Sequence, residues 1–130
     1  MTNRRAKHEY WRNESGAGAT EFVLVLIPFA ALIFGIINLC LMFYANHTLQ
    51  YAVQSAARCY SVDFTACGGS AGTTQTYATT HYSGPNIGVT FTAMPYPTGC
   101  GHTVTGSGNF PLNAVVYTLS VPLAATACFP

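Results

Sequence analysis

The chain has 130 residues, of which only 7% are charged, whereas an ordinary soluble domain carries roughly 25%. Beyond Glu21 the charged side chains are Arg58 and Asp63 alone. This composition excludes a strong nucleic-acid binder for the bulk of the chain, because no basic patch is present to neutralise phosphates. It also argues against intrinsic disorder, which needs low hydrophobicity and high net charge. So bare a surface indicates a protein that is anchored in a membrane, shielded in an assembly, or both.

A basic leader, residues 1–16, precedes an uncharged apolar stretch over residues 22–44. As a helix this stretch would be about 34 Å long, enough to cross a hydrocarbon core of about 30 Å. A single segment can cross only as a helix, because every backbone polar group must be satisfied internally. We therefore predict a transmembrane helix. Since the basic flank lies before it, the N-terminus is expected in the cytoplasm and the remainder is expected to be exported.

The helix is expected to continue past the membrane. Apolar residues recur at a spacing near 3.5, which is typical of an amphipathic helix. They are Leu39, Phe43, Leu49, Val53, Ala56 and Tyr60. We predict one long helix over residues 17–58, whose upper part offers a stripe for packing.

The remaining residues, 59–130, are predicted to form a small exported head. Residues 73–82 form either a short helix or a loop, and residues 87–94 alternate as a half-buried strand. Residues 102–109 alternate weakly, residues 111–113 are expected to turn, and residues 114–121 form the second clear strand. The predicted fold class is α+β: a long N-terminal transmembrane helix, then a disulfide-stapled antiparallel sheet of three strands packed on its upper part.

Four of the five cysteines follow the apolar run and lie in this head. A hydrophobic core made from about 70 residues rarely supplies more than about 3–5 kcal/mol of folding stability unless disulfides or a metal add to it. Four cysteines in such a region indicate a disulfide framework and an oxidising compartment, and they allow three pairings. We favour Cys59 with Cys67, which closes a short loop at the end of the helix. Cys100 would then pair with Cys128, joining the start of one hairpin strand to the tail beyond its partner.

The junction between leader and helix is the most specific feature of the sequence. Glu21 directly precedes the apolar stretch. A carboxylate at this position raises the free energy of membrane insertion and usually needs a partner of opposite charge. If a peptidase cut after Gly16, the new amine of Ala17 would lie about one helical turn before Glu21 and could pair with it in its own or a neighbouring chain. The alternative is an ordinary interfacial glutamate before an uncleaved signal anchor.

The residues at this junction carry a resemblance to a known family. Residues 16–22, GAGATEF, resemble the prepilin-peptidase site of type IV pilin-like proteins. The run EFVLVLIP at 21–28, followed by FGII at 34–37, is similar to the TadE-like family, the pseudopilins or minor pilins of the tight-adherence (Flp) pilus. The likeness covers residues 12–58 well. It implies cleavage between Gly16 and Ala17, residence in the bacterial inner membrane, and subunit registration by Glu21 and Phe22. It also implies prepilin peptidase, other pilin subunits and the pilus assembly machinery as partners.

Two features inside the apolar helix affect its shape and packing. Pro28 removes the hydrogen bond to the carbonyl of Leu24 and is expected to kink the helix. Ala31 and Gly35 have the small-xxx-small spacing of closely packed membrane helices. The alternative for Pro28 is a kink that the membrane helix merely tolerates. The alternative for Ala31 and Gly35 is a motif that is common in membrane helices and marks no contact.

No constellation for catalysis or metal binding is visible. His47, His81 and His102 lack CxxC or HxxxH spacing, and exported cysteines more often form disulfides. Asp63 is the only carboxylate after the membrane segment, which leaves acid–base pairs without members. We therefore predict no catalytic residue, no metal and no cofactor.

These observations favour a pilin-like structural subunit, a minor pilin or pseudopilin, that acts by assembly and not as an enzyme. Two alternatives remain. An uncleaved, signal-anchored periplasmic binding module or adhesin would keep an intact N-terminus. A small envelope enzyme would need clustered titratable residues.

Overall fold

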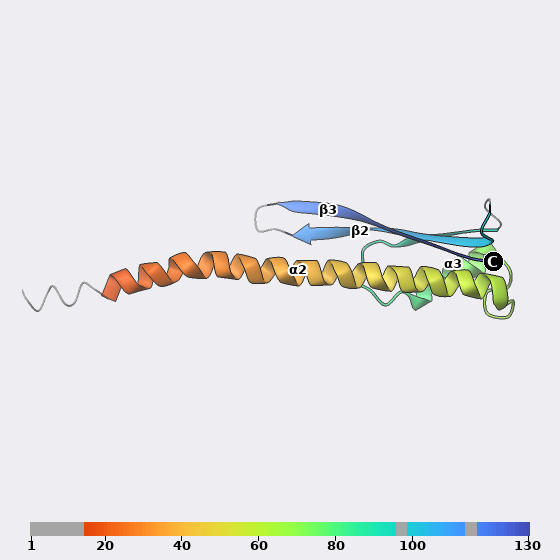
Figure 1. Cartoon of the computed structure of the whole chain (residues 1–130), viewed down its shortest axis with the longest axis horizontal. Coiled ribbons are helices and arrows are strands. Elements are labelled where there is room, and N and C mark those ends of the chain that lie inside the picture. Colours follow the sequence, from red (N-terminus) through yellow and green to blue (C-terminus); the bar gives the residue numbers. More distant parts are fainter. Residues whose placement is uncertain (1–14, 96–98, 114–116) are drawn as a thin grey trace, which may run out of the picture. The chain divides into compact units, whose positions relative to one another are not determined.

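The computed structural model describes residues 15–95, 99–113 and 117–130 (Figure 1). Its elements in chain order are helix α2 (Ser15–Val62), helix α3 (Ala71–His81) and the strands β1 (Thr90–Met94), β2 (His102–Asn113) and β3 (Thr118–Phe129). The α+β class, the long N-terminal helix and the antiparallel sheet of three strands are confirmed. The chain divides into two compact units, Met1–Ile37 and Asn38–Pro130.

The first unit, in its described part, is the N-terminal portion of α2. Its large apolar side chains are exposed all around the helix, from Phe22 to Ile37. Pro28 lies inside α2, which continues through it as one helical element. Among the described residues α2 is the helix that is long and apolar enough to cross a membrane. A surface that is apolar on every side suits lipid or neighbouring helices rather than water.

In the second unit α2 forms one wall of the hydrophobic core. Leu49, Val53, Ala56 and Tyr60 are buried against the sheet, as the apolar spacing predicts. The expectation is wrong for Leu39 and Phe43, which are exposed. The sheet instead meets this part of α2 through a second cluster in which Ala45 is fully buried. A real helix has 3.6 residues per turn, so a stripe extrapolated at 3.5 drifts off the packed face over several turns.

The sheet has the order β1-β2-β3 with antiparallel pairing throughout. Its core-facing side presents Phe91 from β1, Val104 and Phe110 from β2, and Ala125 from β3. Gly106 of β2 allows a close approach, because a Cβ there would lie 2.9 Å from side-chain atoms of three core residues of α2 and β1. The sheet therefore lies close on the helix.

The strand boundaries differ from those predicted. Residues 111–113 do not turn but complete β2, and β3 begins at Thr118 and runs to Phe129 instead of ending at residue 121. The expectation that residues 114–116 are strand falls outside the described residues. β1 begins only at Thr90, although Ile87 is buried as expected. Prolines at 111 and 122 look like strand breakers in sequence, but both lie on a hairpin that pairs without interruption across them.

The chain reverses after α2 through a disulfide-closed loop. Cys59 is bonded to Cys67, with Cα atoms 5.9 Å apart, and Cys100 to Cys128, with Cα atoms 6.1 Å apart. These are the pairings that the sequence analysis favours. Of the two alternatives for residues 73–82, the structure has the helix, α3. All four bonded cysteines lie in the second unit. Cys40 belongs to the same unit but is free and exposed.

Candidate processing and assembly site

The predicted cleavage site lies among the first described residues of α2. The helix is described from Ser15 onward, so the bond between Gly16 and Ala17 is helical. A glycine in a helix interior costs about 1 kcal/mol relative to alanine, so Gly16 and Gly18 weaken the helix locally. Among the described residues, nothing lies within 4 Å of a Cβ placed on Gly16 or on Gly18. The described surroundings of these two glycines are therefore open.

Glu21 and Phe22 follow on the exposed surface of the same helix. Ala17 and Glu21 are separated by four positions, the spacing that brings two residues to one face of a helix. The rise between them is about 6 Å. An amine created at Ala17 would therefore have the Glu21 carboxylate as a near neighbour on its own chain. Phe22, at 66% exposure, offers an apolar contact next to that carboxylate.

The small-residue pair in α2 faces open space. Ala31 and Gly35 are both exposed, and nothing lies within 4 Å of a Cβ placed on Gly35. Within the structure this face has no neighbour, so it is available for another helix or for lipid. Pro28 lies three residues before Ala31 and removes one backbone hydrogen bond from the same stretch.

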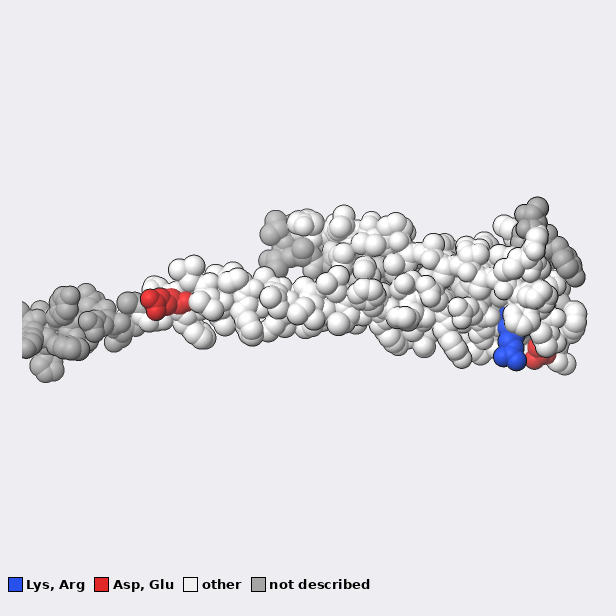
Figure 2. All heavy atoms as spheres, in the orientation of Figure 1, with Lys and Arg blue, Asp and Glu red and all other residues white. Residues whose placement is uncertain are grey.

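The charged groups of the second unit gather at one end (Figure 2). Arg58 and Asp63 are its two charged residues, and both are exposed near the end of α2. The rest of this unit presents uncharged polar and apolar atoms. Such a surface has little charge to keep copies apart, and it tolerates contact with other subunits or with lipid.

The histidines do not come together. His81 stacks on Tyr77 with ring centroids 3.9 Å apart, and His102 lies against Tyr60 at 4.2 Å. His47 is exposed on α2. Among the residues that the structure describes, no group of three His, Cys, Asp or Glu side chains is placed to hold a metal ion.

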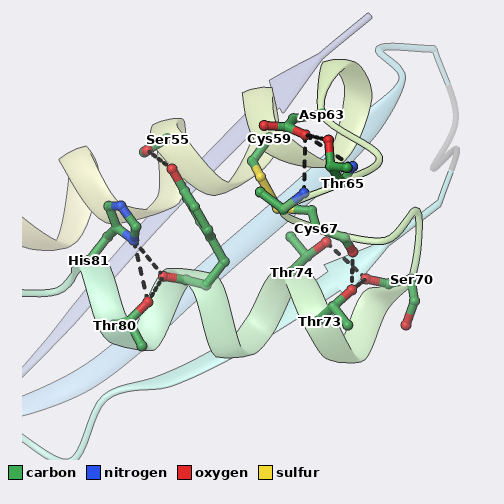
Figure 3. The surroundings of a disulfide bond; sticks show 12 residues. Ser55, Cys59, Asp63, Thr65, Cys67, Ser70, Thr73, Thr74, Thr80 and His81 are labelled. Carbon is green, nitrogen blue, oxygen red and sulfur yellow. Dashed lines mark hydrogen bonds between the residues drawn. A yellow bond between two sulfur atoms is a disulfide. The ribbon is translucent and has the colours of Figure 1, made fainter.

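Asp63 organises the loop that follows α2 (Figure 3). One carboxylate oxygen accepts hydrogen bonds from the Thr65 hydroxyl at 2.7 Å and from the backbone N–H groups of Thr65 and Ala66, each at 3.0 Å. The Cys67 N–H donates to the Asp63 carbonyl at 3.1 Å, which brings Cys67 back toward Cys59. As the only carboxylate after the membrane segment, Asp63 is predicted to have no acid–base partner, and that prediction does not include this turn. The signal for the turn in the sequence is the D-x-T spacing of an Asx turn.

The Asp63 turn predicts a pH dependence in the head. The hydrogen bond from the Thr65 hydroxyl, followed by those from the backbone N–H groups, holds the pKa of Asp63 below its usual 3.8. A depressed folded-state pKa stabilises the fold above 3.8, and this contribution is lost as the pH falls through the folded value. We expect the melting temperature of the wild-type head to fall more steeply than that of Asp63→Asn between neutral pH and well below 3.8. Parallel slopes in thermal melts of the two proteins would contradict this assignment.

A second contact that the sequence did not reveal fastens the loop after α3 to α2. The Tyr44 hydroxyl donates to the Ser83 carbonyl at 2.9 Å, and the Tyr82 hydroxyl donates to the Pro85 carbonyl at 2.8 Å. Burial raises the pKa of Tyr82. Hydrogen bonds between residues 39 positions apart leave no signal in a single sequence.

The described residues thus offer an open segment around Gly16, a carboxylate about one helical turn later and, in the first unit, an apolar helix that is exposed on every side. Residues 16–58 match the family model described as TadE-like protein. The match begins at Gly16 and confirms the resemblance to the TadE-like family over α2. It ends at Arg58, so the sheet and all four bonded cysteines lie beyond it. No curated protein and no solved structure matches the chain.

Proposed function

We propose that the chain is a pilin-like structural subunit, a minor pilin or pseudopilin, of a tight-adherence pilus. Prepilin peptidase removes residues 1–16, and α2 then packs with the helices of other subunits while the head selects partners. The observation that carries this proposal is the TadE-like match that starts at Gly16, combined with the open described surroundings of Gly16. The chain acts by assembly and is the substrate of an enzyme rather than an enzyme itself.

Glu21 is assigned the role of registering subunits. After cleavage, the amine of Ala17 and the Glu21 carboxylate form a pair of opposite charges at the edge of an apolar helix. In lipid a buried carboxylate without a partner is costly, which favours arrangements that bring an amine to it. The amine can come from the chain that carries Glu21 or from a neighbouring chain. A pair between two chains fixes the axial offset between their helices.

The inner membrane is the proposed location, with the N-terminus in the cytoplasm and the head outside. The leader carries its basic residues before the apolar stretch, as the positive-inside rule requires for this orientation. Two disulfides in the head suit an oxidising compartment. The exposed apolar surface of α2 accommodates lipid before assembly.

Cleavage is tested by mass spectrometry of the N-terminus after coexpression with a prepilin peptidase. We expect the wild-type chain to begin at Ala17 and Gly16→Leu to keep the whole leader, because the enzyme must bind a residue without a side chain before the cut. Gly18→Leu is the matched control: it lies in the same turn, with equally open surroundings. It should be processed like the wild type.

An intact wild-type chain in the presence of the peptidase would overturn this proposal. That outcome would favour the uncleaved, signal-anchored binding module or adhesin. Equal blockage by Gly16→Leu and Gly18→Leu would mean that bulk anywhere in the turn prevents processing, which would remove the assignment of the site to Gly16.

A further inference from the structure

The hairpin of β2 and β3 continues past the hydrophobic core, and its core-facing side stays apolar. In the register, Phe110 lies opposite Val121 and Leu112 opposite Leu119. Alternate residues of a strand share a face, so Leu119 and Val121 form a row, and Tyr117 lies directly before the first residue of β3. The exposed fraction of the side chains rises toward the end of the hairpin. Phe110, which pairs with Val121, is 5% exposed, whereas Leu119 is 54% exposed and Tyr117 is 67% exposed. We call Leu112, Tyr117 and Leu119 the hairpin tip.

The hairpin tip lies toward the N-terminal end of the part of α2 that belongs to the second unit. At the other end of β2, His102 contacts Tyr60 near the end of α2. Phe110 packs in one cluster with Ala45, and Met42 and Leu112 both pack against that cluster. Within the second unit, β2 therefore runs antiparallel to α2. Met42 is one of the last residues of the proposed membrane span, and Leu112 packs against the same cluster as Met42.

The free edges of the hairpin carry prolines where an N–H would point away from the sheet. The Asn109 N–H donates outward, to the Ile87 carbonyl at 3.1 Å. Residues two apart in a strand direct their N–H groups the same way, so the nitrogen of Pro111 also points outward. Pro122 pairs with Asn109 and occupies the matching outward position on β3. Each proline removes one unpaired donor, which lowers the cost of leaving water and blocks the addition of another strand.

Charge is absent from this end of the unit. Arg58 and Asp63 lie at the opposite end, beside the loop after α2 (Figure 2). A side chain such as Tyr117, with an apolar ring and a polar hydroxyl, is the type enriched at membrane interfaces. The apolar row, the prolines and the missing charge together favour lipid as the neighbour of the tip.

We propose that the hairpin tip inserts into the interfacial region of the membrane that α2 spans, as a second lipid contact of the head. This inference rests on the membrane anchoring assigned under the proposed function. The outer face of the hairpin near the tip carries Asn113, Thr118 and Ser120, and β3 retains an unpaired edge. Open edges do not occur in hydrocarbon, so the tip reaches the headgroups and the outermost part of the acyl chains and goes no deeper.

Tryptophan fluorescence in lipid vesicles tests this contact with the full chain. The single native tryptophan, Trp11, is replaced by phenylalanine, and Leu119→Trp supplies the reporter. The variant is reconstituted at low protein density in phosphatidylcholine vesicles, with or without lipid that carries bromine near the headgroup end of its acyl chains. We expect the brominated lipid to quench Leu119→Trp at least about twice as strongly as a reporter outside the interface.

Met94→Trp is the matched control. Met94 is 57% exposed, almost the same as Leu119, but pairs with Thr103 at the other end of the sheet. Leu32→Trp, at a position 58% exposed in the first unit, reports whether α2 itself enters the bilayer. Disulfide formation in each variant is checked by titrating thiols under denaturing conditions, where Cys40 alone should react.

Equal quenching of Leu119→Trp and Met94→Trp would overturn the proposal. If Leu32→Trp is quenched in that experiment, the anchor holds and only the tip contact fails. If Leu32→Trp is not quenched, the anchoring fails and the tip contact fails with it. A blue shift of Leu119→Trp that appears only at high protein density, without quenching by lipid, would assign the tip to a second copy of the chain and also overturn the proposal.

Discussion

Replacing Gly106 by valine is expected to destabilise the head by about 3 kcal/mol, at the upper end of the usual cost of overpacking a core. A Cβ at this position would lie 2.9 Å from side-chain atoms of Leu49, Val53 and Phe91. Those side chains come from α2 and β1 and converge on one point of β2, so none can withdraw without disturbing another. The two further methyl carbons of valine increase the overlap. Urea unfolding in detergent micelles, followed by circular dichroism, measures the loss.

Thr105→Val is the control for this substitution. Thr105 is the preceding residue of β2, and its hydroxyl accepts a 3.4 Å hydrogen bond from Thr126 on the outer side of the sheet. Valine has nearly the same shape there and favours strands, so we expect a change within about 0.5 kcal/mol. If Gly106→Val proves as stable as Thr105→Val, the sheet does not lie on α2 at the close distance described above.

Removing the disulfide at the base of the hairpin is the second change with a large expected effect. The Cys100→Ala, Cys128→Ala double variant should lose about 3–4 kcal/mol, because cysteines 28 positions apart no longer restrict the unfolded chain. Both side chains are exposed, so little packing is lost with them. A core of this size supplies only about 3–5 kcal/mol by itself. The variant is therefore expected to be partly unfolded at ambient temperature, measured as a lower urea midpoint.

Cys40→Ala serves as the comparison for the double variant. Cys40 is free and exposed on α2, and its replacement leaves both disulfides in place. We expect its urea midpoint to equal that of the wild type. A double variant with the same midpoint as Cys40→Ala would show that the bond between Cys100 and Cys128 adds nothing to the stability of the head.

The sequence was most informative where one residue pattern determines one structure. The uncharged run and the apolar spacing after it predicted a long helix that ends at residue 58, and α2 ends at Val62. Helix formation depends on contacts three and four positions apart, which a sequence pattern displays directly. The core-facing positions Leu49, Val53, Ala56 and Tyr60 followed from the same periodicity. Leu39 and Phe43 did not, because a stripe extrapolated at 3.5 residues per turn drifts off the packed face of a helix with 3.6 residues per turn.

Strand boundaries were less predictable. Pro111 and Pro122 are local signals for the end of a strand, but their nitrogens lie on outer edges, where no N–H is required. Which edge of a strand is free depends on its pairing partners, and a single sequence does not contain that information. The resulting error placed a turn at residues 111–113, which are part of β2.

The candidate site was predicted from residue types at fixed spacing, with Gly16, Ala17 and Glu21 defining the junction. The structure adds that Gly16 is helical and that no other described residue lies within 4 Å of a Cβ placed on it. The role of Asp63 was missed because its three hydrogen bonds arise from the conformation of a loop. The Tyr44 contact to Ser83 was missed because it joins segments that are distant in the chain.

The covalent bonds of the head are unevenly distributed. Both disulfides lie near the end of α2, together with the hydrogen bond from Ser61 to the Phe129 carbonyl, and the far end of the hairpin has no such bond. Local opening of a protein begins where few buried contacts hold the backbone. Fluctuations of the hairpin should therefore start at Asn113 and Thr118 and die out toward Cys100 and Cys128. The disulfides hold the sheet in place at Cys100 and Cys128. Asn113 and Thr118, at the other end of the hairpin, can change conformation while the hydrophobic core stays packed.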